Sequence, residues 1–347
     1  MKGNPYTLSF GKEPNQLISR IQQENEVIET FTSEKPGQQI YMITGVRGAG
    51  KTVFMTNIIN QLKNKKDWIC VELSAERDLL KTLASKLSSD NELSQLFFNA
   101  KINLSFFGFG VEIKNTAPIT DIEIALSKMI ETLKKQGKHL LISVDEISNS
   151  QYIREFTSVF QILIRQDLPI FLQMTGLYQN ISELQNEKTL TFLYRAPKIK
   201  LTSLNLNAIA NNYQKNFHCS AQQANEMAHL TKGYSFAFQV LGHLTWKYDG
   251  DYKKAIPEYQ QYLEELCYEK MWSELSEIDK KVMFAIASTG SSTIQTIREA
   301  CDMSTNQFNP YRKRLILKGL IDGSQRGHVY LTLPLFKEFI LANVYYE

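Results

Sequence analysis

The first part of the chain alternates short apolar runs with longer helix-periodic stretches. The apolar runs have the length of buried strands and cover residues 39–44, 68–73, 140–144, 170–174 and 198–201. A glycine-rich turn follows the first run, and a helical stretch then reaches about residue 63, before the second run. A strand, a helix and a second strand at this spacing form a βαβ unit, which implies a parallel sheet with helices on its faces. The pattern therefore predicts an α/β domain, preceded by a helix at residues 15–33.

Residues 101–115 interrupt this alternation between the second and third predicted strands. Alternating apolar positions around Gly108 and Gly110 predict a β-hairpin inserted into the domain. The apolar face of this hairpin has two interpretations. It either packs on its own domain or forms a contact surface for a partner subunit.

The pattern changes twice after the fifth apolar run. It is wholly helical from about residue 205 to 272. Two further helices follow, then a third that Ser304 can cap, and then a two-stranded segment with Gly323 and Gly327 at its bend. This order of elements is typical of a winged helix-turn-helix. The predicted domains are an α/β domain at 1–203, a helical domain at 204–273 and a winged-helix domain at 274–347.

Composition agrees with a folded protein of several domains. A length of 347 residues fits two or three domains of roughly 150 residues, and 43% hydrophobic with 22% charged residues allow a packed core. The 39 basic and 36 acidic residues leave a net charge of +3. That balance does not indicate a nucleic-acid binder, so any basic surface must be local.

The cysteines and the absence of long apolar runs limit the cellular context. The four cysteines lie far apart without CxxC spacing, which disfavours a zinc ribbon or a disulfide framework and favours a reducing compartment. The amino terminus lacks the apolar core of a signal peptide, and no apolar run reaches ~18 residues. We therefore expect a soluble cytoplasmic protein with no membrane segment.

Residues 45–52 match the phosphate-binding pattern GxxxxGK[ST] in full, between an apolar strand and a helix. Glycines let the backbone turn so that successive N–H groups face phosphate oxygens, and the helix start adds a favourable dipole. Lys51 would reach the β- and γ-phosphates, and the Thr52 hydroxyl would ligate Mg²⁺. The nucleotide-binding residues predicted for this segment are Gly45, Val46, Arg47, Gly48, Ala49, Gly50, Lys51, Thr52 and Val53.

The third predicted strand ends in two acidic residues, Asp145 and Glu146. Ligands of open α/β sheets bind at the carboxyl ends of the strands, where this pair projects. Asp145 would hold Mg²⁺, directly or through water. Glu146 would orient and deprotonate the attacking water as a general base.

Two other polar sites have alternative interpretations. Thr175 ends the fourth strand, where it either senses the γ-phosphate through the attacking water or only caps the strand. Residues 64–67 fit the NKxD guanine pattern of GTPases, but they follow the first helix instead of a later strand. A polar turn is the better interpretation of residues 64–67, so ATP is the expected nucleotide.

A local basic cluster lies in the C-terminal domain. In a DNA-bound winged helix, Arg312, Lys313 and Arg314 of the third helix would lie near backbone phosphates, with Arg326 on the wing. Winged helices also serve as protein-docking modules, and a basic cluster is often only a solvated face. Contact with duplex DNA and contact with a protein therefore both remain as hypotheses.

Together these motifs resemble the AAA+ ATPases, in particular the group that unites origin-recognition-like ATPases with STAND-type signalling ATPases. The form GxRGxGKT, with Arg47, is similar to the usual loop of that group. The resemblance covers nearly the whole chain. It implies a P-loop NTPase parallel sheet of AAA+ type, a helical lid at 204–273 and a C-terminal winged helix.

The resemblance also implies further site residues. The segments at residues 4–6, 10–11 and 18–20 look like the amino-terminal box around adenine, so Arg20 is an expected nucleotide contact. Thr175 takes the sensor-1 position and is grouped with Lys51 and Glu146 as catalytic. Arg195 looks like an arginine near the γ-phosphate or in a neighbouring subunit's site. The lid departs from the family, because residues 233–235 read Gly-Tyr-Ser in place of Gly-x-Pro, with no evident sensor-2 arginine.

Two functions follow from these expectations. The first is a slow ATPase that couples its nucleotide state to a DNA-binding winged helix. The alternative is a STAND-type signalling or defence scaffold, in which the nucleotide controls assembly and the winged helix makes protein contacts. In either case a homo-oligomer or a protein partner is compatible with the sequence.

Overall fold

The computed structural model describes residues 3–8, 14–110 and 112–343 and contains two compact units. The sheet unit comprises Ile21–Thr44 and Phe54–Lys200, and the lid unit comprises Met1–Arg20, Gly45–Val53 and Leu201–Glu347. The phosphate-binding loop thus belongs to the lid unit, although the strand before it belongs to the sheet unit.

The sheet unit is built on five parallel strands in the order β2-β3-β4-β1-β5. The strands are β1 (Ile40–Thr44), β2 (Trp68–Ser74), β3 (His139–Asp145), β4 (Ile170–Gly176) and β5 (Lys198–Lys200). The five predicted strands and their parallel arrangement are confirmed. Residues 64–67 form the connection between α2 and β2, as expected for a polar turn.

The strand register aligns the carboxyl ends of the central strands. Thr44 of β1 pairs with Gly176 of β4, and Val144 of β3 pairs with Met174 of β4. β4 therefore lies between the strand that leads into the phosphate-binding loop and the strand that ends at Asp145.

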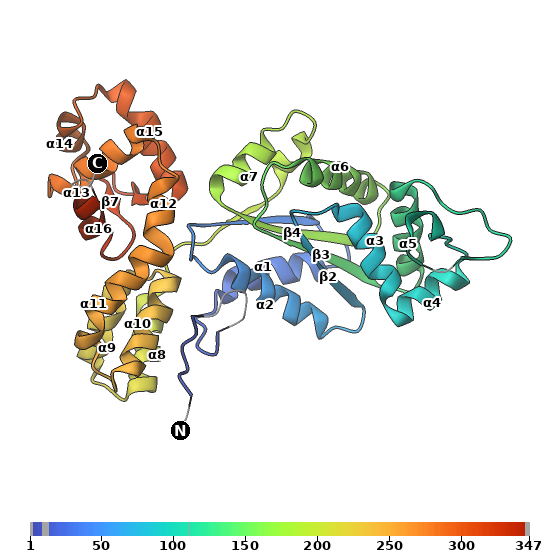
Figure 1. The fold of residues 1–347 in the computed structure, drawn as a ribbon, viewed down its shortest axis with the longest axis horizontal. Coiled ribbons are helices and arrows are strands. Elements are labelled where there is room, and N and C mark those ends of the chain that lie inside the picture. The colour runs from blue at the N-terminus through green and yellow to red at the C-terminus, as the bar shows by residue number, and fades with distance from the viewer. Residues whose placement is uncertain (1–2, 9–13, 111, 344–347) are drawn as a thin grey trace. The chain divides into compact units, whose positions relative to one another are not determined.

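Helices cover both faces of the sheet (Figure 1) because successive strand residues point to opposite sides and both sides are apolar. Met42 belongs to a core with helices α3, α5 and α6, whereas Tyr41 packs on Phe31 of α1 with ring centroids 5.5 Å apart. The helices after α1 (Ile21–Thr32) are α2 (Lys51–Lys63), α3 (Leu79–Ser89), α4 (Asn91–Asn99), α5 (Ile122–Lys135), α6 (Gln151–Arg165) and α7 (Tyr178–Gln185), with short 3-10 turns η1 (Ser105–Phe107) and η2 (Thr191–Arg195).

The expectation of a β-hairpin at residues 101–115 is wrong. The described residues of this segment contain η1 and no strand. The Asn103 side chain donates to the carbonyl of Thr116 at 2.7 Å and accepts from the N–H of Ser105 at 3.1 Å. These local bonds satisfy backbone groups that a ladder would otherwise pair, while Ile102 and Leu104 are buried in the core of the sheet unit.

The lid unit begins its helical part with α8 (Leu206–Phe217), α9 (Ala221–Thr231), α10 (Ser235–Lys247) and α11 (Tyr252–Leu263). α11 continues through a π-helical turn, η3 (Glu264–Tyr268), into α12 (Glu269–Ser273). The wholly helical pattern predicted for this stretch is confirmed.

The last part of the lid unit, the C-terminal module (residues 274–343), contains the three predicted helices and the predicted two-stranded segment, followed by a further helix that was not predicted. It consists of α13 (Glu277–Ser288), α14 (Ile294–Ala300), α15 (Thr305–Lys318), the antiparallel strands β6 (Ile321–Asp322) and β7 (Tyr330–Leu331), and α16 (Phe336–Asn343). Ser304 caps α15 through a capping box with Gln307. One continuous apolar core joins this module to α8–α12. No helix among the described residues is long and apolar enough to cross a bilayer.

The amino-terminal segment is anchored in the lid by Tyr6. Its ring is 2% exposed, stacks on Phe217 with centroids 5.7 Å apart, and its hydroxyl donates to Asn212 at 2.8 Å. The ring lies directly over Gly242 of α10, where a Cβ atom would come within 2.4 Å of a ring carbon. Gly242 is thus required by the close approach of an aromatic ring to a helix backbone.

This approach makes a specific prediction for Gly242→Ala. A glycine-to-alanine change inside a helix ordinarily stabilises it by about 1 kcal/mol. Here the added methyl group overpacks against Tyr6, and we expect a loss of about 1–3 kcal/mol in the free energy of unfolding. Thermal unfolding measures the effect. In a Tyr6→Ala background the same change should become neutral or stabilising, and a higher melting temperature for the single variant would contradict the prediction.

Candidate nucleotide-binding site

The phosphate-binding loop has the backbone that its glycines predict. Gly48 and Gly50 adopt left-handed φ values of +74° and +89°, which residues with a side chain rarely take. Between them the N–H of Ala49 donates to the carbonyl of Val46 at 3.1 Å. α2 begins at Lys51, so the loop ends at a helix amino terminus. Glycine turn and helix start follow in the order that anion binding by backbone amides requires.

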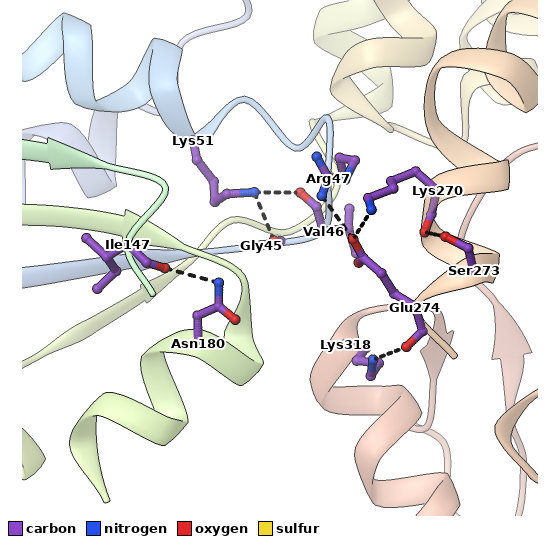
Figure 2. A network of polar contacts seen from close by, with 10 residues as sticks. All are labelled: Gly45, Val46, Arg47, Lys51, Ile147, Asn180, Lys270, Ser273, Glu274 and Lys318. Carbon is purple, nitrogen blue, oxygen red and sulfur yellow. Dashed lines mark hydrogen bonds and ion pairs between the residues drawn. The ribbon is translucent and has the colours of Figure 1, made fainter. Parts of the chain in front are cut away.

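Lys51 lies against its own loop. Its ammonium group donates to the carbonyls of Gly45 at 3.1 Å and Val46 at 3.0 Å (Figure 2). Neutral carbonyls are weaker acceptors for an ammonium group than anionic phosphate oxygens. Two of the partners of Lys51 are therefore neutral carbonyl groups of the loop, which a phosphate can replace.

Three consecutive residues at the start of α10 bond three consecutive carbonyls of the loop. The pairs are Tyr234 Oη with Arg47 O at 2.7 Å, Ser235 Oγ with Ala49 O at 3.0 Å and Phe236 N with Gly48 O at 3.1 Å. The only signal of these bonds in the sequence was the departure from the AAA+ pattern at residues 233–235. Tyr234 is 5% exposed, and burial raises the pKa of its hydroxyl well above the ordinary value. The hydroxyl therefore remains a protonated donor at neutral pH.

The side chain of Arg47 leaves the loop toward the start of the C-terminal module. Its guanidinium lies 3.2 Å from the carboxylate of Glu274, and Lys270 of α12 lies 3.6 Å from the same carboxylate (Figure 2). Lys318 of α15 donates to the backbone carbonyl of Glu274 at 3.3 Å. The side chains of Arg47 and Glu274 are each 34% exposed, so water screens the pair, and such pairs contribute about 0–1 kcal/mol. No motif in the sequence indicates a role for Glu274.

Arg20 joins the loop to the chain after β5. Its guanidinium donates to the carbonyl of Thr202 at 2.6 Å and approaches that of Ala49 at 3.5 Å. In the same expected amino-terminal box, Tyr6 is buried among the lid helices, whereas Phe10 and Gly11 lie outside the described residues.

In the sheet unit, Thr175 bonds both acidic residues at the carboxyl end of β3, Asp145 and Glu146. Its hydroxyl donates to Asp145 Oδ1 and accepts from the N–H of Glu146 at 3.2 Å. The same N–H lies 3.0 Å from Asp145 Oδ1, and the N–H of Ile147 donates to the Thr175 carbonyl at 2.8 Å. Glu146 has a left-handed φ of +51°, which a residue with a side chain holds at a cost of about 1 kcal/mol or more. The bonds to Thr175 and Asp145 hold that turn, and the Glu146 side chain is exposed.

The predicted residues therefore form two sets in different units. The lid unit holds the loop with Arg20, and the sheet unit holds Asp145, Glu146 and Thr175. Arg195 lies exposed at the end of η2, also in the sheet unit.

The oxygen donors in these two sets are of the type that Mg²⁺ prefers: the hydroxyl of Thr52 and the carboxylate of Asp145. Among the described residues, no group of three or more His, Cys, Asp or Glu side chains could hold a metal. Thr52 and Asp145 each supply one oxygen donor, and they belong to different units.

Two residues of the basic cluster are committed to contacts within the C-terminal module. Arg314 forms an ion pair of 2.7 Å with Asp279, whose side chain is 2% exposed. Arg312 donates to the carbonyl of Gly323 at 3.4 Å. Lys313 and Arg326 are exposed. The spacing of the cluster in the sequence could not reveal the pairing with Asp279, which lies 35 residues away.

Comparison with known families finds two matching models. Residues 23–167 match an ATPase domain found predominantly in Archaea, and residues 265–340 match a domain of unknown function, DUF8462. No curated protein matches the sequence.

Solved structures match over nearly the full length. A Walker-type ATPase of Pyrococcus abyssi has a TM-score of 0.67 at 14% identity, over 94% of this chain and 96% of that one. The ORC2 protein of Aeropyrum pernix, in ADPNP-ADP complexes, has a TM-score of 0.59 at 13% identity, over 98% of each chain. Its ADP form has a TM-score of 0.51 at 14% identity, over 97% of each chain. The chain therefore has the fold of an AAA+ P-loop ATPase of the origin-recognition type.

Proposed function

We propose that this chain is an ATP-driven switch, which binds and slowly hydrolyses ATP and transmits the nucleotide state to its C-terminal module. The observation that carries the proposal is that the phosphate-binding loop is bonded directly to the lid helix α10 and to Glu274, where the module begins. A change at the loop therefore acts on both elements through existing contacts.

Residues of the loop bind the nucleotide in this proposal. Lys51 exchanges the carbonyls of Gly45 and Val46 for β- and γ-phosphate oxygens, and the amides of the loop together with the start of α2 bind the same anion. Arg20 contributes from the amino-terminal segment. Thr52 and Asp145 would hold Mg²⁺, which neutralises charge on the phosphates.

Hydrolysis requires a water placed by Glu146. The exposed carboxylate can accept a proton from that water, a general-base role. Thr175 holds the backbone of Glu146 and the carboxylate of Asp145, which supports a part in ordering the acidic pair. Arg195 is exposed and would stabilise the transition state only from within an oligomer, as an arginine supplied to a neighbouring site.

Two variants separate binding from hydrolysis. Lys51→Ala should abolish ATP binding, because the only ammonium group of the loop is removed. Glu146→Gln should keep ATP affinity within about twofold and lower turnover by about 10²-fold or more, because it removes the base but keeps the shape. Calorimetry and phosphate release measure the two quantities. Unchanged turnover in Glu146→Gln would remove this residue from the mechanism.

The contact between Arg47 and Glu274 provides a test of transmission. We expect ATP to alter amide hydrogen exchange at residues 270–276 and 315–319 of the wild-type protein. Glu274→Gln should diminish that response, while ATP affinity stays within about fivefold because the exposed pair is weak. Glu269→Gln, a change at an exposed residue of the preceding helix α12, is the matched control. An equal response in both variants would contradict transmission through Glu274.

For the output of the switch, we propose that the C-terminal module is a winged helix that contacts duplex DNA through Lys313 and Arg326. Both are exposed, one on α15 and one on the segment between β6 and β7. A STAND-type scaffold is the second candidate, and the engagement of Arg312 and Arg314 within the module favours it. In that case this surface contacts protein.

Salt dependence distinguishes the two outputs. If DNA phosphates bind Lys313 and Arg326, log K should fall linearly with log salt, and Lys313→Ala or Arg326→Ala should each reduce the slope by about 1. Lys215→Ala, an exposed lysine on α8, should leave the slope unchanged. Fluorescence anisotropy with a duplex measures this. No binding, or no change of slope in either variant, would favour the protein-docking scaffold.

A further inference from the structure

Residues at the start of α10 donate hydrogen bonds to the backbone carbonyl groups of the phosphate-binding loop and not to the side chains of the loop. The carbonyls of Arg47, Gly48 and Ala49 each accept a hydrogen bond from residues 234–236, at 2.7 to 3.1 Å. Two donors are hydroxyl groups and the third is a backbone N–H of the first turn of α10, which has no acceptor within its own helix. Three peptide groups in succession are thus held from one side.

Because each peptide group is planar, the hydrogen bonds to these carbonyl groups also fix the direction of the neighbouring N–H groups. In a trans peptide the carbonyl of one residue and the N–H of the next point in opposite directions, and none of the described peptide bonds is cis. Holding the carbonyls of Arg47 and Ala49 on the side of α10 therefore directs the N–H groups of Gly48 and Gly50 to the opposite side. Neither of these N–H groups has a hydrogen-bond acceptor among the described residues.

Tyr234 is held so that its hydroxyl cannot move away from the loop. It packs so close to Gly48 that a Cβ atom there would lie 2.2 Å from the hydroxyl oxygen. Its side chain is buried, so the ring is enclosed while the hydroxyl donates to the carbonyl of Arg47 at 2.7 Å.

We infer that Tyr234 and Ser235 are positioning residues that orient the N–H groups of Gly48 and Gly50 toward the phosphate chain of the nucleotide. This inference rests on the proposed ATP site and adds residues that no motif of the loop contains. Neither residue carries a charge, and neither needs to touch the nucleotide. They act by having the amide dipoles already aligned when the anion arrives, so less free energy is lost in ordering the loop.

This role affects the phosphate part of the ligand alone. Loss of one hydrogen bond between α10 and the loop should weaken the binding of ATP and ADP by a similar factor. The affinity for adenosine should not change, because adenosine lacks the anion that the amides bind. General destabilisation of the lid would weaken all three ligands or none.

The experiment compares Tyr234→Phe and Ser235→Ala with Tyr259→Phe. Tyr259 is likewise buried in the lid, and its hydroxyl also donates to a backbone carbonyl, but to that of Leu230 at 3.0 Å instead of a carbonyl of the loop. Calorimetry with ATP, ADP and adenosine should give about fivefold weaker binding of both phosphorylated ligands for Tyr234→Phe and for Ser235→Ala. The affinities of the Tyr259→Phe control should equal those of the wild type. Melting temperatures should fall alike for Tyr234→Phe and Tyr259→Phe.

Ser235→Thr keeps the hydroxyl and should restore the affinity that Ser235→Ala loses. If Lys51→Ala abolishes ATP binding while Tyr234→Phe and Ser235→Ala bind ATP like the wild type, the hydrogen bonds from α10 have no positioning role and the proposed site stands. If the wild-type protein binds no ATP, the proposed function itself fails.

Discussion

The pairing of β4 with β1 on one side and β3 on the other is the constraint on which the chemistry of this chain depends. All three strands run in the same direction, and their register brings Thr44, Asp145 and Gly176 to one edge of the sheet. Thr175 lies next to Gly176 at the carboxyl end of β4, beside the end of β3. Its hydroxyl therefore bonds both residues of the acidic pair. A shift of one residue in the pairing of β4 would turn Thr175 to the other face and leave Glu146 without the bond that holds its left-handed turn.

In the lid unit, hydrogen bonds from α10 and an ion pair with Glu274 hold the phosphate-binding loop. The bonds between α10 and the loop are partly buried and made to backbone carbonyl groups, so salt affects them less than it affects an exposed ion pair. The contact of Arg47 with Glu274 is partly exposed and screened, and it contributes little free energy. The bonds to the carbonyl groups hold the backbone of the loop, whereas the ion pair is weak enough to be exchanged in the proposed cycle of nucleotide binding and release.

Elements with a strong local pattern could be predicted, and contacts between distant residues could not. The five strands are continuous apolar runs, and the loop carries its own glycines, so each was readable from a short window of sequence. Residues 101–115 misled because alternation alone does not distinguish a hairpin from a packed loop, and the bonds of Asn103 decided the outcome. The bond from Tyr234 to Arg47 joins residues 187 positions apart, and no local pattern indicates it. Arg314 was predicted to lie near DNA phosphates, whereas in the structure it pairs with Asp279 of another helix.

The π-helical turn η3 has a consequence for how this lid tolerates change in length. A π turn accommodates one residue more than an α-helical turn, and each residue advances a helix by about 100°. Lys270 and Glu274 follow η3 at a spacing of four residues, which places them on the same side, and Glu274 contacts Arg47 of the loop. Because the extra residue is contained within that one turn, deleting a single residue from η3 would restore a regular α-helical turn and leave the residues of α12 on nearly the same face. The same deletion within α11 or α12 would rotate the residues that follow it by about 100°, so a change of length is better tolerated at η3 than in the helices on either side.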